Sequence, residues 1–281
     1  LPIYASEEPD LKATIPGFHL EGPYISPEDG FRGAHSEEWV KPPDWDEFLE
    51  VYEASGEKIK IVSLAPETEG ALEFIEQCTA LGIVIALAHH NAPAGRIREA
   101  IQAGARLVTH LGNGMANTIH RHENPLWAQL AYDELHISII ADGFHLTPEE
   151  ILTFYKVKGD KRTILVSDTT QLAGMPAGEY EWDGKRVVLE DPGVIKLPEQ
   201  NVLAGAAAPL RRGVEHFMKV TGADLDTALR LASANPAQLI ELDDRGEIAP
   251  GKLADFVLFT MQDGKIQIQK TVKAGEVVFE R

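Results

Sequence analysis

The sequence predicts an α/β fold built on a buried parallel sheet, and two observations lead to this prediction. Short apolar runs rich in β-branched residues alternate with helical patterns, which is typical of α/β folds. The runs are apolar almost throughout, as expected for strands buried on both faces of a parallel sheet. They lie at residues 17–20, 59–64, 83–87, 106–108, 137–140 and 163–166.

Helices are expected between these strands, because apolar residues recur there at the spacing of one helix face. The pattern is present in residues 45–52, 71–75, 97–101 and 151–155. The second of these continues to Cys78, the only cysteine of the 281 residues. A single cysteine cannot form an internal disulfide, and burial is its ordinary fate in a helical pattern. This usage fits a reducing compartment.

The pattern changes after residue 168. Residues 179–204 predict a hairpin excursion with Asp183-Gly184 as its turn. Two helices are expected next, at about 207–221 and 224–233, with Asp224 capping the second. The tail from Leu253 to Phe279 predicts short strands of a separate small sheet.

Composition excludes several classes of function. The formal charge of −18 argues against nucleic acid or an anionic membrane as partner, because both are bound chiefly through clustered Lys and Arg. No apolar stretch approaches the roughly 18 residues of a membrane span. Residues 1–8 have neither a basic start nor an apolar signal core. We expect a soluble, cytoplasmic protein.

Ionisable side chains follow the predicted strands at their carboxyl ends. They are Glu21, Glu67, His89-His90, His110 and Asp168, with Asp142 and His145 after the run at 137–140. In a barrel of parallel strands these ends meet at one mouth, where the active sites of such barrels lie. Imidazole and carboxylate are the donors that Zn or Fe prefers, so Glu21, His89 and His110 suit a catalytic metal. Each taken alone also fits a hydrogen-bonded structural residue.

Seven segments make the interpretation more specific. They are GFHLEGP (17–23), SLAPE (63–67), HHNA (89–92), THLGNGM (109–115), ADGFH (141–145), VSDT (166–169) and GEIAPGKLAD (246–255). In this order they resemble the N-acetylglucosamine-6-phosphate deacetylase family of the amidohydrolase superfamily. The resemblance covers essentially the whole chain.

The resemblance implies a metal-dependent (β/α)8 TIM-like barrel with a small β-sandwich. It identifies Glu21, His89 and His110 as ligands of one divalent metal ion, Zn or Fe. His90 occupies a position that is not a ligand in the family. Asp168 matches the catalytic acid and base.

The resemblance also implies residues that contact the substrate. His35 matches a histidine facing the substrate amide, where it would stabilise the oxyanion, and His145 matches one near the sugar. Asn113 and the backbone of Gly114 match the phosphate cradle. Arg121 is the candidate for an arginine that reaches the phosphate of a neighbouring subunit, which implies a homodimer. From the residues alone, His145 also fits a cap for a helix near Thr147, His35 an exposed loop residue, and Asn113-Gly114 an ordinary turn.

Three departures from the family stand out. The first barrel strands and half of the β-sandwich precede the matching segments in the family, so we expect an incomplete barrel at residues 1–245 and β-sandwich strands at 246–281. Residues 203–206 read Leu-Ala-Gly-Ala where the family has two serines. Residues 119–125 form a longer segment than the family counterpart.

The implied reaction is hydrolysis of the acetamide of N-acetylglucosamine 6-phosphate, giving glucosamine 6-phosphate and acetate in amino-sugar metabolism. One alternative is an amidohydrolase for another N-acylated sugar or amino acid, because the departures lie where the substrate is bound. The other is a noncatalytic sugar-binding barrel.

Overall fold

The computed structural model describes residues 14–182 and 184–281, which form two compact units. The first unit extends to Thr109 and includes Gly114–Leu135. The second consists of His110–Asn113 and His136–Arg281. Two sequence predictions fall on residues outside this description: the absence of a signal core, at residues 1–8, and the hairpin turn, at Asp183.

The first unit contains four strands that pair in parallel and in chain order. They are β1 (Phe18–Glu21), β2 (Ile59–Leu64), β3 (Val84–Leu87) and β4 (Ala105–Val108). Glu21 pairs with Ser63, and Leu64 pairs with Leu87, so the carboxyl ends of the first three strands are in register. Residues that follow these strands therefore emerge at the same edge of the sheet.

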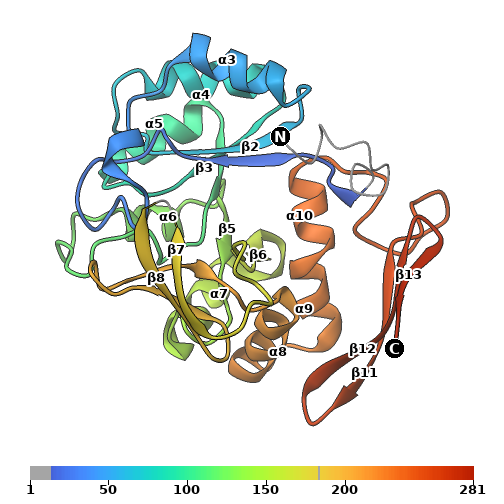
Figure 1. Cartoon of the computed structure of the whole chain (residues 1–281). Coiled ribbons are helices and arrows are strands. Elements are labelled where there is room, and N and C mark those ends of the chain that lie inside the picture. Colours follow the sequence, from blue (N-terminus) through green and yellow to red (C-terminus); the bar gives the residue numbers. More distant parts are fainter. Residues whose placement is uncertain (1–13, 183) are drawn as a thin grey trace. The chain divides into compact units, whose positions relative to one another are not determined.

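Helices cover this sheet. Between the strands lie η1 (Glu37–Trp39), α3 (Trp45–Ala54), α4 (Ala71–Ala80) and α5 (Ala94–Ala103), followed by α6 (Pro125–Ala131). Figure 1 shows α3, α4 and α5 gathered on one side of β2 and β3. Phe74 of α4 packs edge-to-face on Tyr24 and Phe48, with ring centroids 5.1 and 5.2 Å apart. Cys78 is buried and free, as predicted.

The second unit contains the two remaining parallel strands, β5 (His136–Ile139) and β6 (Thr163–Leu165), joined through α7 (Pro148–Arg162). All six predicted strands are therefore present, within two residues of the expected bounds. Helix α7 starts with a capping box in which Thr147 and Glu150 bond to each other's backbone amides. The alternative interpretation of His145 as the helix cap is therefore wrong.

The predicted hairpin is present as β7 (Gly178–Trp182) and β8 (Lys185–Glu190), and it extends into a larger sheet. Two more antiparallel strands, β9 (Val194–Leu197) and β10 (Val202–Ala206), give the order β10-β9-β8-β7. These added strands are short and contain glycine or lysine. A strand signal of that kind is weak in the sequence alone.

Three helices follow: α8 (Leu210–Thr221), α9 (Leu225–Ala232) and α10 (Ala234–Leu239). Asp224 caps α9 as predicted, because its carboxylate accepts a hydrogen bond from the Thr227 amide at 2.8 Å. The chain continues into an antiparallel sheet of β11 (Phe256–Gln262), β12 (Lys265–Lys273) and β13 (Glu276–Glu280). This confirms the predicted small sheet of the tail.

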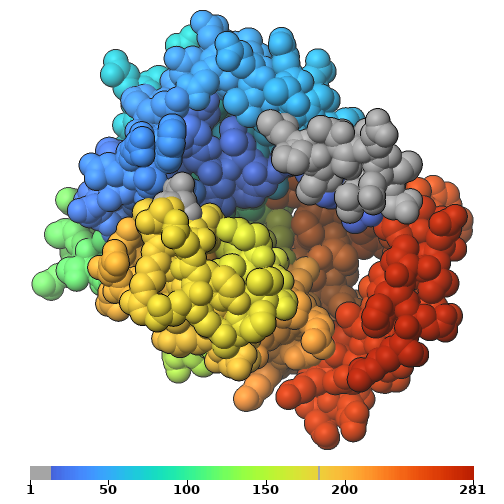
Figure 2. Space-filling view, viewed as in Figure 1, coloured from blue at the N-terminus to red at the C-terminus, as the bar shows by residue number. Residues whose placement is uncertain are grey.

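The three-stranded sheet is attached to α8 through Ile266 of β12. Its amide donates to the Glu215 carboxylate at 2.7 Å, and its carbonyl accepts from the Arg211 guanidinium at 3.1 Å. Large apolar side chains of this sheet, among them Val277, Val278 and Phe279, are exposed. Figure 2 shows much of the sheet, in red, open at the surface. Within residues 14–182 and 184–281, no helix combines the length and apolarity that crossing a bilayer requires.

Candidate metal centre and active site

Glu21 and His89 are brought together at the strand ends of the first unit. Glu21 is the last residue of β1, and His89 lies two residues beyond β3. Nε2 of His89 is 3.1 Å from Oε1 of Glu21. Nδ1 of His89 lies 2.9 Å from the carbonyl oxygen of Phe31, which can only accept, so Nδ1 carries a proton. This contact leaves Nε2 as the nitrogen suited to a metal.

His35 is the third member of this cluster. Its Nε2 lies 3.9 Å from the same Glu21 oxygen, and its ring meets that of His89 edge-on, with centroids 4.7 Å apart. One donor atom from each of the three residues lies within 4.8 Å of the others, a spacing that could hold a metal ion. His35 was predicted to face the substrate amide, and in the structure it lies among potential ligands.

The loops around His89 are shaped by backbone conformation. His89 itself has a left-handed backbone, with φ of 49°. Glycines 33 and 114 adjoin its ring so closely that a Cβ atom would lie 2.8 and 2.7 Å from ring atoms. Gly114, predicted to cradle phosphate, therefore borders the ring of a candidate metal ligand.

His90 behaves as predicted for a residue that is not a ligand. It is buried, its Nδ1 accepts a hydrogen bond from the Ala92 amide at 3.2 Å, and its Nε2 contacts the Gln129 carboxamide. Burial, assisted by the neighbouring His89, lowers the pKa of His90 to about 3. A neutral ring with both nitrogens engaged is a structural residue.

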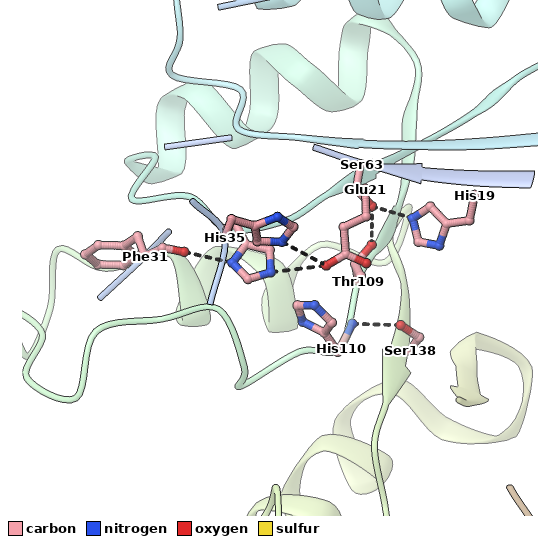
Figure 3. A network of polar contacts seen from close by, with 9 residues as sticks. His19, Glu21, Phe31, His35, Ser63, Thr109, His110 and Ser138 are labelled. Atoms are coloured by element: carbon pink, nitrogen blue, oxygen red, sulfur yellow. Dashed lines mark hydrogen bonds and ion pairs between the residues drawn. The ribbon is translucent and has the colours of Figure 1, made fainter. Parts of the chain in front are cut away.

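His110 opens the second unit, directly after Thr109. It also has a left-handed backbone, with φ of 33°. Its amide donates to the hydroxyl of Ser138 on β5 at 2.8 Å (Figure 3), and the next amide, of Leu111, donates to the Ser138 carbonyl at 2.8 Å. The Asn113 amide then closes a turn onto the His110 carbonyl at 2.9 Å. Ser138 was not predicted, although a serine between Ile137 and Ile139 is a polar interruption of an apolar strand.

Asp168 lies three residues beyond β6 and is the third predicted site residue with a left-handed backbone, at φ of 51°. Its carbonyl accepts a hydrogen bond from the Ala206 amide at 2.8 Å. A Cβ atom on Gly205 would lie 2.9 Å from that carbonyl. The segment in which the family serines are replaced therefore lies directly against the candidate acid and base.

Asp142 and His145 form a buried pair in the second unit. Oδ1 of Asp142 accepts from the amides of Phe144 and His145 at 2.8 and 3.1 Å, and Oδ2 lies 2.9 Å from Nδ1 of His145. Burial raises the pKa of Asp142, but the hydrogen bonds from His145 and the two amides outweigh it and hold the pKa below its ordinary value. Nε2 of His145 is buried and has no hydrogen-bond partner among the residues the structure describes.

Arg121 is exposed and lies in the loop before α6. Its carbonyl accepts a hydrogen bond from the indole N–H of Trp127 at 2.9 Å, and His120 Nδ1 accepts from the Glu123 amide at 2.9 Å. The guanidinium belongs to the first unit, as does the Glu21–His35–His89 cluster.

The relatives of the chain identify its family. The sequence model of the Amidohydrolase family matches residues 6–278, so the chain belongs to the amidohydrolase family. The N-acetylglucosamine-6-phosphate deacetylase of Bacillus subtilis is 31% identical over 276 residues, covering 98% of this chain and 68% of that protein. Within the family, the chain belongs with the N-acetylglucosamine-6-phosphate deacetylases, as predicted.

Solved structures agree with this assignment. The N-acetylglucosamine-6-phosphate deacetylase of Thermotoga maritima is 34% identical with a TM-score of 0.84, covering 94% of this chain and 70% of that one. A mutant deacetylase from Mycobacterium smegmatis in complex with N-acetyl-D-glucosamine-6-phosphate is 30% identical with a TM-score of 0.85, covering 93% and 68%. The predicted barrel-type fold is confirmed, and the family supports hydrolytic deacetylation in amino-sugar metabolism. The chain spans about two thirds of the length of these relatives.

Proposed function

We propose that the protein hydrolyses the acetamide of N-acetylglucosamine 6-phosphate, releasing glucosamine 6-phosphate and acetate. The observation that carries this proposal is the Glu21–His35–His89 cluster at strand ends of a deacetylase-family chain, with His89 oriented by the Phe31 carbonyl. The complex of the Mycobacterium smegmatis relative with this sugar phosphate supports the substrate.

The donor set fits a divalent metal ion, in a family that is metal-dependent. We propose Glu21, His89 and His110 as the ligands of one Zn or Fe ion, as the family motifs imply. His110 follows directly on Thr109, whose hydroxyl lies 2.7 Å from that of Ser63 in the first unit. When bound, such an ion would lower the pKa of water and polarise the amide carbonyl.

The protein's own groups supply proton transfer. Asp168 would accept the proton of the attacking water and return it to the leaving amine, which departs only when protonated. His35 would donate a hydrogen bond to the oxyanion that forms on the substrate, a contribution of roughly 3 kcal/mol for one well-placed donor. Its position 3.9 Å from Glu21 also suits a ligand, and metal content of a His35 variant separates the two roles.

Substrate contacts follow the family motifs. Asn113 and the Gly114 backbone would contact the phosphate, and His145 would contact the sugar. Arg121 would reach the phosphate of a neighbouring subunit in a homodimer. We further propose residues 1–245 as barrel and 246–281 as β-sandwich, in a cytoplasmic protein.

The test is acetate release with metal analysis. The full chain should release acetate from N-acetylglucosamine 6-phosphate in proportion to its Zn or Fe content, and much more slowly from N-acetylglucosamine. Alanines at 204 and 206 favour a second candidate, an amidohydrolase for another N-acylated sugar or amino acid, because their segment bonds to Asp168 through the Ala206 amide. Faster release from an unphosphorylated substrate would favour that candidate, and sugar binding without any release would favour a noncatalytic barrel.

A further inference from the structure

Glu67 is a half-buried acid in the SLAPE segment that the proposed reaction leaves without a role. It lies three residues beyond β2, between the strand ends that carry Glu21 and His89. Its Oε1 accepts a hydrogen bond from the backbone amide of Asn91 at 2.7 Å. Its Oε2 is buried and has no hydrogen-bond partner among residues 14–182 and 184–281. Glu67 is therefore held by the loop that follows His89.

That loop connects β3 to α5 and has to keep His89 in a left-handed conformation, with φ of 49°. Non-glycine residues adopt this conformation only where the surroundings enforce it. One hydrogen bond restrains the backbone at His89 itself: its carbonyl accepts from the Ser26 amide at 2.9 Å. The next restraint along the chain is at Asn91, two residues further, whose amide donates to Glu67.

A second hydrogen bond joins the same two segments. Nε of Arg96, in the first turn of α5, donates to the Pro66 carbonyl at 2.8 Å. Residues 66–67 thus hold both the start of α5 and the loop before it. Burial raises the pKa of Glu67, although the hydrogen bond from the Asn91 amide opposes this shift.

We propose that Glu67 is a positioning residue, which fixes the loop after β3 so that Nε2 of His89 keeps its place beside Glu21. Glu67 itself contacts neither residue of the pair in the bonds described. The inference rests on the proposed metal site, and it predicts an effect on metal affinity rather than on proton transfer.

Glu28 provides a matched control. Its carboxylate accepts from the side-chain amide of the same Asn91, at 2.9 Å, whereas Glu67 accepts from the backbone amide. Both carboxylates neighbour the same residue, but only Glu67 restrains the main chain that leads back to His89. Removing Glu28 should therefore leave the backbone of the loop in place.

The experiment measures Zn²⁺ affinity of the full chain by competition with a chromophoric chelator, together with thermal unfolding. Glu67→Ala should weaken Zn²⁺ binding by about 10- to 100-fold, the usual effect of losing a group that orients a ligand. Glu67→Gln keeps an acceptor oxygen and should bind within a few-fold of wild type. Glu28→Ala should match wild type, and saturating Zn²⁺ should restore most of the kcat of Glu67→Ala.

Three results would overturn the inference: unchanged affinity in Glu67→Ala with only a lower Tm, equal losses in Glu67→Gln and Glu67→Ala, or an equal loss in Glu28→Ala. If Glu67→Ala does not fold, Glu67→Asp withdraws the oxygen by one methylene, and unchanged affinity there counts against the inference. A wild-type chain that binds Zn²⁺ but releases no acetate would refute the proposed function and leave this inference intact.

Discussion

Nε2 of His89 lies 3.1 Å from Oε1 of Glu21, although 68 residues separate the two in the chain. They meet because β1, β2 and β3 are parallel and in register, so that residues following β1 and β3 emerge at one edge. The Phe31 carbonyl accepts from Nδ1 and fixes the His89 ring, with Nε2 on the side of the Glu21 carboxylate. This pair is the part of the proposed metal site that lies within one unit.

Metal content tests this site directly. His89→Ala and His110→Ala should each lose most bound Zn or Fe and, with it, acetate release, because each removes a proposed ligand. His122→Ala, which changes an exposed histidine outside the proposed ligand set, is the control and should keep its metal. Stoichiometric metal with normal acetate release in His110→Ala would show that the assigned ligand set is wrong.

Asp168→Asn separates proton transfer from metal binding. Asparagine preserves size and tolerates the left-handed backbone at φ of 51°, so fold, metal content and KM should change little. It cannot accept a proton, and kcat should fall by at least about 100-fold, within the usual contribution of general acid and base catalysis. Near-normal kcat would assign the base elsewhere, and loss of metal would make Asp168 mainly a ligand.

Arg121 should contribute to binding of phosphorylated substrates only. Arg121→Ala should raise KM for N-acetylglucosamine 6-phosphate far more than for N-acetylglucosamine, because only the former loses a charge-assisted contact. Equal effects on the two substrates would remove Arg121 from the phosphate site.

A contact between subunits can be tested separately. If Arg121 serves a neighbouring subunit, mixing Arg121→Ala with Asp168→Asn should recover activity in mixed dimers. No recovery, in a mixture in which subunit exchange is demonstrated, would favour a contact within one chain.

Asp142 should set the tautomer of His145. The ionised carboxylate accepts from Nδ1 at 2.9 Å, so ¹⁵N NMR of the free protein should show Nδ1 protonated. In Asp142→Asn, Oδ1 can still accept from the amides of Phe144 and His145, while the NH₂ group faces Nδ1 and should shift the proton to Nε2. An unchanged ¹⁵N pattern would contradict this role.

The pKa of Asp142 also gives a stability prediction with a defined sign. It is lowered from 3.8, so the ionised form stabilises the fold above that pH, and the contribution is lost as pH falls through the folded-state value. Urea midpoints of wild type and Asp142→Asn should therefore converge as pH falls below 3.8. A difference between the two urea midpoints that does not change with pH would show that ionisation of Asp142 does not contribute to stability.

Most of the fold could be predicted from the sequence, because the hydrophobic pattern of a strand or helix depends on residues that are close in the chain. The strand from Ile59 to Leu64 was predicted at its observed bounds, and Asp224 caps the helix that it was expected to cap. The four-stranded sheet was predicted only as its first hairpin. Its strands from Val194 to Ala206 are stabilised by pairing with neighbours, which no local pattern records.

The candidate site could be predicted less well from the sequence where backbone groups and distant loops form it. The proximity of Glu21 and His89 followed from their places after parallel strands. The position of His35 did not, because a loop histidine has no periodic pattern to place it. The bond between Glu67 and Asn91 depends on a main-chain amide, which every non-proline residue carries and which the sequence therefore cannot single out.

The left-handed backbones of His89, His110 and Asp168 imply a conflict between catalytic activity and thermal stability. A left-handed backbone costs on the order of 1–2 kcal/mol for an ordinary side chain, and glycine at these positions would avoid that steric cost. Variants selected only for a higher Tm should therefore acquire substitutions at these positions. Such substitutions would remove the proposed catalytic and metal-binding side chains. An engineer who seeks a hardier enzyme should leave these three positions unchanged and look for gains elsewhere, for example on the exposed apolar residues Val277, Val278 and Phe279.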